Sequence, residues 1–201
     1  MSGYEIRALD ASTWNAYARL LDKHKGCGFG GCWCTWFHSR EGRPEGLKGR
    51  PWKERLVREG NAHAALIFDG DAAVAWCQYG SPDELPNIHH RKEYEASRTD
   101  ELPDYRITCI FVDRDYRRKG VAAIALRGAV DLIAQAGGGV VEGYPHDLQE
   151  GEKVRPQFLY NTTRSLYEQN GFSYDRPKGK KNCVMRRTVT PVKARRRPRV
   201  G

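Results

Sequence analysis

Residues 26–38, GCGFGGCWCTWFH, bring together the side chains of this sequence that most resemble a chemical site. Cys27, Cys32, Cys34 and His38 carry soft atoms that can bind a transition metal, and the thiols can also be oxidised. The glycines and aromatic residues between them would instead suit the wall of a binding pocket. The segment therefore has three readings, which are a zinc site, a redox centre and a pocket wall.

The spacing of these residues argues against zinc and against a redox pair. One residue separates Cys32 from Cys34, so along a strand their side chains would share a face and crowd a single ion. No Cys-x-x-Cys pair precedes a helix, as a thiol redox motif would require. We therefore predict no metal and interpret the segment as a pocket wall. Small buried thiols packed beside core aromatic residues are the alternative.

A second candidate site follows the apolar run YRITCIFV at residues 105–112. Arg117, Arg118 and Lys119 precede Gly120, which opens a predicted helix. The first turn of a helix has unpaired backbone N–H groups and a partial positive charge, so it suits a phosphate group. Gly120 would let the backbone approach such a ligand closely. The alternative is a solvated basic loop before an ordinary helix.

Hydrophobic periodicity and turn residues predict the elements that position these two segments. We predict strands at residues 4–9, two joined by an Asp-Gly turn within 62–80, and others at 105–112, 137–144 and 182–189. We predict helices at about 13–24, from Pro51 to residue 60, at about 120–136 and within 161–172, and a polar loop with a short helix at 81–103. This order predicts an α/β (α+β) layer structure with a mixed sheet.

Length and composition favour one intracellular domain. The chain has 201 residues, has no apolar run long enough to span a membrane, and begins with no apolar signal sequence. We therefore expect a cytoplasmic protein with six reduced thiols. Residues 1–175 hold 23 basic and 25 acidic residues, a net charge of −2, whereas residues 176–201 hold 11 basic and no acidic residues. We predict a domain at 1–188 and a basic, disordered tail at 189–201, which could touch nucleic acid, although a solubilising end explains it equally well.

Two motifs in this order resemble the GCN5-related N-acetyltransferase (GNAT) superfamily. Arg117-x-x-Gly120-x-Ala122 follows a predicted strand, and Leu166-Tyr167 with Gly171-Phe172 lies in the next predicted helix after the following strand. The segments Cys32-Trp33-Cys34, Trp76-Cys77 and Glu142-Gly143-Tyr144-Pro145 look like one bacterial branch of that superfamily. The resemblance implies a central, mixed, mostly antiparallel sheet with helices on both faces, and acetyl-coenzyme A as cosubstrate.

The resemblance also implies which residues hold acetyl-coenzyme A. Backbone groups of Ile110, Phe111 and Val112 would pair with the pantetheine arm like an added strand. The pyrophosphate would lie in the loop formed by Arg117, Arg118, Lys119, Gly120, Val121 and Ala122. The family often has an asparagine seven residues before the tyrosine. Here Tyr160 stands at that position and Asn161 follows it, so either could contact the coenzyme.

Two residues are candidates for the proton transfers of acetyl transfer. The resemblance assigns Tyr167 as the acid that protonates the departing thiolate, and a phenol with a pKa of about 10 is protonated at neutral pH. A packed helix aromatic is the alternative. Glu142 lies between apolar residues of a strand, where a carboxylate is costly unless it is used or paired. It could take the amine proton through water or simply hold the cation, and a buried or edge salt bridge is the alternative.

These residues together predict an N-acetyltransferase that acts on a primary amine by direct attack in a ternary complex. Trp33, Trp36, Phe37, Trp76 and Tyr144 would form the acceptor wall, and with Glu142 they favour a cationic small molecule. A protein N-terminus or lysine is an alternative acceptor. A non-catalytic coenzyme A-binding module, docked on nucleic acid or the ribosome through its tail, is an alternative function. We expect no membrane partner, and a homodimer is possible.

Overall fold

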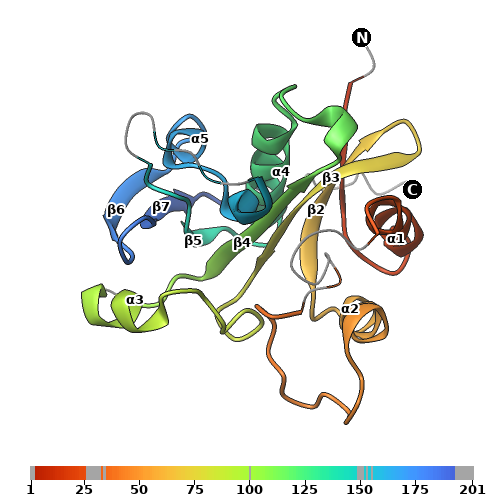
Figure 1. Cartoon of the computed structure of the whole chain (residues 1–201), viewed down its shortest axis with the longest axis horizontal. Coiled ribbons are helices and arrows are strands. Elements are labelled where there is room, and N and C mark those ends of the chain that lie inside the picture. The colour runs from red at the N-terminus through yellow and green to blue at the C-terminus, as the bar shows by residue number, and fades with distance from the viewer. Residues whose placement is uncertain are drawn as a thin grey trace, which may run out of the picture.

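The computed structural model describes residues 3–25, 33, 35–99, 101–148, 152, 154 and 156–192. One seven-stranded sheet runs through them in the order β1-β2-β3-β4-β5-β7-β6 (Figure 1). Only β4 and β5 are parallel neighbours, and the other pairs are antiparallel. The strands are β1 (Glu5–Ala8), β2 (His63–Asp69), β3 (Ala72–Gly80), β4 (Tyr105–Val112), β5 (Gly139–Gly143), β6 (Ser173–Pro177) and β7 (Cys183–Val189).

The predicted α/β class and the mostly antiparallel mixed sheet are confirmed, with helices on both faces. The helices are α1 (Trp14–Lys23), α2 (Gly49–Arg58), α3 (Arg91–Ser97), α4 (Val121–Gln135) and α5 (Arg164–Glu168), with short 3₁₀ turns η1 (Arg114–Tyr116) and η2 (Pro156–Asn161). The prediction that Pro51 opens a helix is wrong by two residues. The sequence pattern did not predict β6, because its residues, SYDRP, form a polar edge strand that ends in proline and has no apolar alternation.

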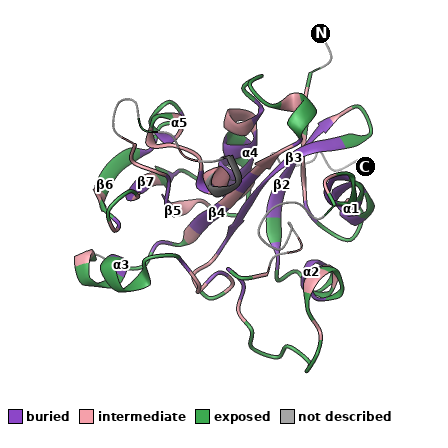
Figure 2. Ribbon diagram, viewed as in Figure 1, coloured by how far each residue is buried: buried purple, intermediate pink, exposed green. Residues whose placement is uncertain are grey.

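Two apolar cores cover opposite faces of the sheet. α4 packs on one face, and α1 with α2 packs on the other (Figure 1). On β2, Ala65 and Ile67 face α4 while Ala64 and Leu66 face α1 and α2, as the two-residue period of a strand requires. The central strands are therefore buried on both sides, which Figure 2 shows in purple.

Strand β4 separates from its neighbour β5 part-way along its length. β5 pairs with β4 only over the three positions Tyr105, Arg106 and Ile107, although β4 continues to Val112. On the other side β4 stays paired with β3, and a register shift after Gln78 leaves Thr108 as an extra residue, a β-bulge. Beyond the bulge, no strand of the described chain pairs with the β5 side of β4.

Described structure continues into the segment predicted as a basic tail. β7 continues to Val189, and the Val192 amide donates a hydrogen bond to the Ala134 carbonyl at the end of α4. The remainder of the predicted tail, residues 193–201, lies outside the described residues. Among the helices that are described, none combines the length and apolar character needed to cross a membrane.

Candidate functional site

The free side of β4 leads to an open turn at the start of α4. Gly120 is the N-cap of α4 with φ +76°, and Arg118 also has a positive φ, +60°. Among the described residues, no acceptor bonds the backbone amides of residues 118–122, and no side chain caps the helix. A Cβ added at Gly120 would meet no atom within 4 Å. The turn therefore presents unbonded amides to open space, with the exposed Arg117, Arg118 and Lys119 beside it.

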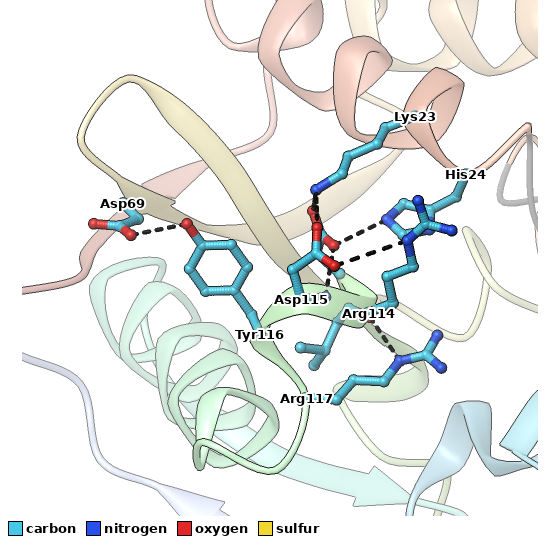
Figure 3. Close-up of polar contacts among 9 residues, drawn as sticks. Lys23, His24, Asp69, Arg114, Asp115, Tyr116 and Arg117 are labelled. Carbon is cyan, nitrogen blue, oxygen red and sulfur yellow. Dashed lines mark hydrogen bonds and ion pairs between the residues drawn. The ribbon is translucent and has the colours of Figure 1, made fainter.

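Ion pairs with α1 hold the loop between β4 and this turn (Figure 3). Lys23 Nζ lies 2.7 Å from carboxylate oxygens of both Asp113 and Asp115, and His24 Nε2 lies 3.2 Å from Asp113 Oδ1. Burial opposes the ionisation of Asp113, but the Lys23 ammonium outweighs it and lowers the pKa of the carboxyl. The loop is thus fixed to α1 at the point where the open turn begins.

Tyr167 carries a buried hydroxyl that no described residue satisfies. The side chain is fully buried between α5 and the sheet, and its ring packs edge-on against Phe172 at 5.0 Å. Burial, with the thiols of Cys77, Cys109 and Cys183 nearby, raises the pKa of this phenol well above its ordinary value. Buried hydroxyls nearly always have a hydrogen-bond partner, so this hydroxyl requires an explanation.

Glu142 lies in a closed polar cluster rather than at an open surface. The hydroxyls of Tyr94 and Tyr144 donate hydrogen bonds to Oε2 at 2.8 and 3.0 Å. Guanidinium nitrogens of Arg176 and Arg186 lie 3.7 and 3.9 Å from Oε1, and the carboxylate is fully buried. These contacts form a buried ion-pair cluster in which Oε1 itself accepts no hydrogen bond from a described residue.

Glu142 and Tyr167 lie on opposite faces of β5. A Cβ at Gly143 would overlap the Tyr167 ring, 2.2 Å from Cε1, so the ring occupies the face toward which position 143 points. Successive positions of a strand point to opposite faces. The side chain of Glu142 therefore leaves β5 on the side away from Tyr167.

The five aromatic residues predicted as one acceptor wall are separated in the structure. Trp33 and Trp76 both contact Tyr17, with centroids at 6.0 and 5.7 Å, within the core under α1 and α2. Tyr144 is buried against Tyr94. Trp36 and Phe37 lie apart from these residues, in contact with each other and with His89.

Tyr160, predicted as a coenzyme contact, joins this last group. Its ring lies 6.1 Å from the Phe37 ring and 5.8 Å from the His89 ring, on the 3₁₀ turn η2 that packs against β4. The next residue, Asn161, is buried and its Oδ1 has no hydrogen-bond partner among the described residues. Asn161, one of the two residues predicted to contact the coenzyme, therefore has a buried acceptor oxygen that a ligand could use.

His38 belongs to a buried polar chain that the sequence did not indicate. Lys53 Nζ lies 2.6 Å from His38 Nε2 and 2.9 Å from Gln78 Oε1, and Gln78 Nε2 donates to Thr108 Oγ1 at 2.8 Å. All four side chains are buried, and the chain ends at the β4 bulge. Burial, and then the Lys53 charge, lower the pKa of His38 well below its ordinary value.

Three residues considered as zinc ligands lie outside the described residues. They are Cys27, Cys32 and Cys34. In the part of the chain that the structure does describe, no group of three or more His, Cys, Asp or Glu side chains could hold a metal ion.

A model of the acetyltransferase (GNAT) family matches residues 18–143, which is more than half of the chain. The chain belongs to the GNAT acetyltransferase family. Its match includes β4, the open turn and the start of α4, but ends before Tyr160, Asn161 and Tyr167. Family membership places acetyl-coenzyme A as the acetyl donor, and the unbonded amides at 118–122 and the free edge of β4 fit such a ligand.

Solved structures of GNAT proteins share the fold at low sequence identity. An acetyltransferase of the GNAT family from Streptococcus pneumoniae is 12% identical with a TM-score of 0.51, over 93% of this chain and 99% of that chain. An N-acetyltransferase from Staphylococcus aureus Mu50 is 9% identical with a TM-score of 0.50, over 93% and 98%. Among curated proteins, none matches.

Proposed function

We propose that this GNAT protein is an N-acetyltransferase that transfers the acetyl group of acetyl-coenzyme A directly to a primary amine. The observation that carries the proposal is the fully buried Tyr167 hydroxyl, which lacks a partner among the described residues. Leaving such a group unsatisfied costs about 1–3 kcal/mol, so we infer that it is kept for a bond made to a ligand.

The coenzyme would be held mainly by backbone groups. No strand of the described chain pairs with residues 110–112 on the β5 side of β4, so their backbone groups could bind an extended amide chain. The Val112 carbonyl already accepts a hydrogen bond from Arg117 Nε at 3.3 Å, which Arg117 would have to release. The amides of residues 118–122 would bind the pyrophosphate, with Arg117, Arg118 and Lys119 adding charge. Bound acetyl-coenzyme A supplies the reactive thioester.

Tyr167 would act as the acid toward the departing sulfur. Because burial raises its pKa, the phenol stays protonated at neutral pH and can donate the proton from Oη. For Glu142 we propose a positioning role. Its carboxylate has two tyrosine hydroxyls on one oxygen and two guanidinium groups near the other, which supports a structural counter-charge rather than a base open to the amine.

The acceptor would approach from the side of Trp36, Phe37 and Tyr160, because η2 joins this aromatic group to β4. Glu142 was one reason to predict a cationic small amine as the acceptor. Because other side chains enclose its carboxylate, Glu142 no longer supports that prediction. A protein amine remains an alternative acceptor. If the protein is instead a non-catalytic module, Tyr167→Phe should leave its function intact and deletion of residues 190–201 should abolish it. If it is an enzyme, Tyr167→Phe should abolish its function and the deletion should leave it intact.

Calorimetric titration with acetyl-coenzyme A tests the proposal. Wild type should bind, and Gly120→Glu should lose at least about tenfold in affinity because its side chain enters the open turn with a like charge. Gly120→Ala is the matched control. Both variants bear the strain of φ +76°, about 1 kcal/mol, but only Glu adds bulk and charge. If wild type does not bind, the proposed function is withdrawn.

A further inference from the structure

A cavity of about 450 Å³ lies beside the aromatic group, between two segments that are far apart in the sequence. It is lined by Trp36, Arg40, Pro86, Asn87 and Arg91. Figure 1 shows the orange segment between α1 and α2 next to the yellow-green segment that leads into α3. The cavity belongs to the side of the molecule from which the acceptor is proposed to enter.

Hydrogen bonds hold the two walls of this cavity together. The Asn87 amide N–H donates to the Phe37 carbonyl at 3.3 Å, and its side-chain Nδ2 donates to the His38 carbonyl at 3.2 Å. The Ser39 amide donates to the Glu84 carbonyl at 2.9 Å. On the Trp36 side, the indole stacks on His89 with centroids 4.1 Å apart and planes 8° from parallel. The cavity is therefore built on contacts that fix its position.

The charge of the lining is positive. Arg40 and Arg91 are exposed, and no acidic residue lines the cavity. Arg91 gives its Nε to Glu95 at 2.6 Å, which leaves its terminal nitrogens for another acceptor, and no described residue bonds the Arg40 guanidinium. Guanidinium groups recognise carboxylates through paired N–H donors. Trp36, 37% exposed, adds a flat apolar surface.

We propose that this cavity binds a carboxylate of the acceptor, so that the substrate is a small amine that also carries a carboxylate group. The inference rests on the proposed acetyl transfer and assigns its acceptor class. The carboxylate would contact Arg40 and Arg91, and the apolar part would lie on Trp36. A purely cationic amine would be repelled by Arg40, and less by Arg91, whose charge is already paired with Glu95.

The test uses binding of two probes that differ only in their charged group. The indole N–H resonance of Trp36, assigned with Trp36→Phe, is followed by NMR while 3-phenylpropionate or 3-phenylpropylamine is added. We expect a saturable shift with the carboxylate and none with the amine. The double variant Arg40→Gln/Arg91→Gln should weaken binding about tenfold, since each exposed pair contributes roughly threefold. Arg43→Gln, an exposed arginine of the same segment outside the lining, is the control.

Three results would overturn the inference, which are a shift with the amine, no shift with either probe, and a carboxylate shift that the double variant keeps. None of them bears on acetyl-coenzyme A binding, which the calorimetry with Gly120→Glu measures separately. If the coenzyme binds and the carboxylate does not, the acetyltransferase stands and only the acceptor class falls. If the carboxylate binds and the coenzyme does not, the proposed function falls.

Discussion

The hydroxyl of Tyr167 is a group for which stability and the proposed function make opposite predictions. Tyr167→Phe should lower kcat by about 10²-fold or more, because an acid at the leaving sulfur is lost. It should leave acetyl-coenzyme A affinity unchanged and raise the free energy of unfolding by about 1 kcal/mol, because a buried unsatisfied hydroxyl is removed. Thiol-release kinetics and denaturant unfolding measure the two effects, and a variant that is destabilised yet fully active would refute the assignment.

Glu142→Gln separates a proton acceptor from a structural counter-charge. The substitution keeps the size of the side chain but leaves the nearby guanidinium groups of Arg176 and Arg186 without their carboxylate. We expect unfolding free energy to fall by about 2–3 kcal/mol, less than a fully buried pair would lose because Arg186 is partly exposed.

The control for that variant is Tyr94→Phe, which removes one hydrogen bond to Glu142 and no charge. It should cost about 1 kcal/mol. A Glu142→Gln protein with unchanged unfolding and a collapsed kcat would instead make Glu142 the base.

At the scale of elements, α1 positions the loop that carries the coenzyme turn. The Asp113 carboxylate pairs with Lys23 Nζ and lies 3.2 Å from His24 Nε2. Its charge therefore helps to hold the loop against the C-terminal end of α1. Asp113→Asn should weaken acetyl-coenzyme A binding about tenfold, because the loop that carries the amides loses a charged contact with α1. Calorimetry measures it.

Asp115→Asn is the matched comparison, because Asp115 is exposed and pairs with the same lysine but has no contact with His24. Its effect should be clearly smaller than that of Asp113→Asn. Equal effects would mean that pairing with Lys23 alone, and not the additional contact of Asp113 with His24, decides affinity.

For the whole molecule, the buried His38 predicts acid sensitivity. Its pKa is well below 6.5 in the folded protein, so below about pH 6.5 the unfolded chain binds a proton that the folded one does not. Stability contributed by this site therefore falls with pH, by up to about 1.4 kcal/mol per unit, until the folded pKa is reached. His38→Gln should flatten the decline when denaturant unfolding is measured between pH 8 and pH 5.

His63 should act in the opposite direction and is the internal comparison. The Glu84 carboxylate, 2.6 Å from Nδ1, raises the pKa of His63 in the folded protein. Its contribution is present below the unfolded pKa and is lost as the pH rises through the folded value. His63→Gln should therefore lose stability at pH 5 and none at pH 9, and the loss should be small because the histidine is about half exposed.

Local sequence patterns were enough to predict the strand, turn and helix between residues 105 and 135. The strand 105–112, the basic turn and the helix after Gly120 were predicted with nearly their final bounds, because strand and helix periodicity and a glycine N-cap are local properties. The hairpin of β2 and β3 was predicted for the same reason, from its Asp-Gly turn.

Contacts between side chains that are far apart in the sequence could not be predicted from local patterns and are seen only in the folded structure. Trp33, Trp36 and Trp76 are chemically alike, yet two lie in a core and one beside a cavity, depending on which helix covers them. The cavity combines residues 36–40 with residues 86–91, and Glu142 is enclosed by residues of α3, β6 and β7 and by Tyr144, just after its own strand. These contacts arise from packing between elements, whose geometry no local pattern encodes.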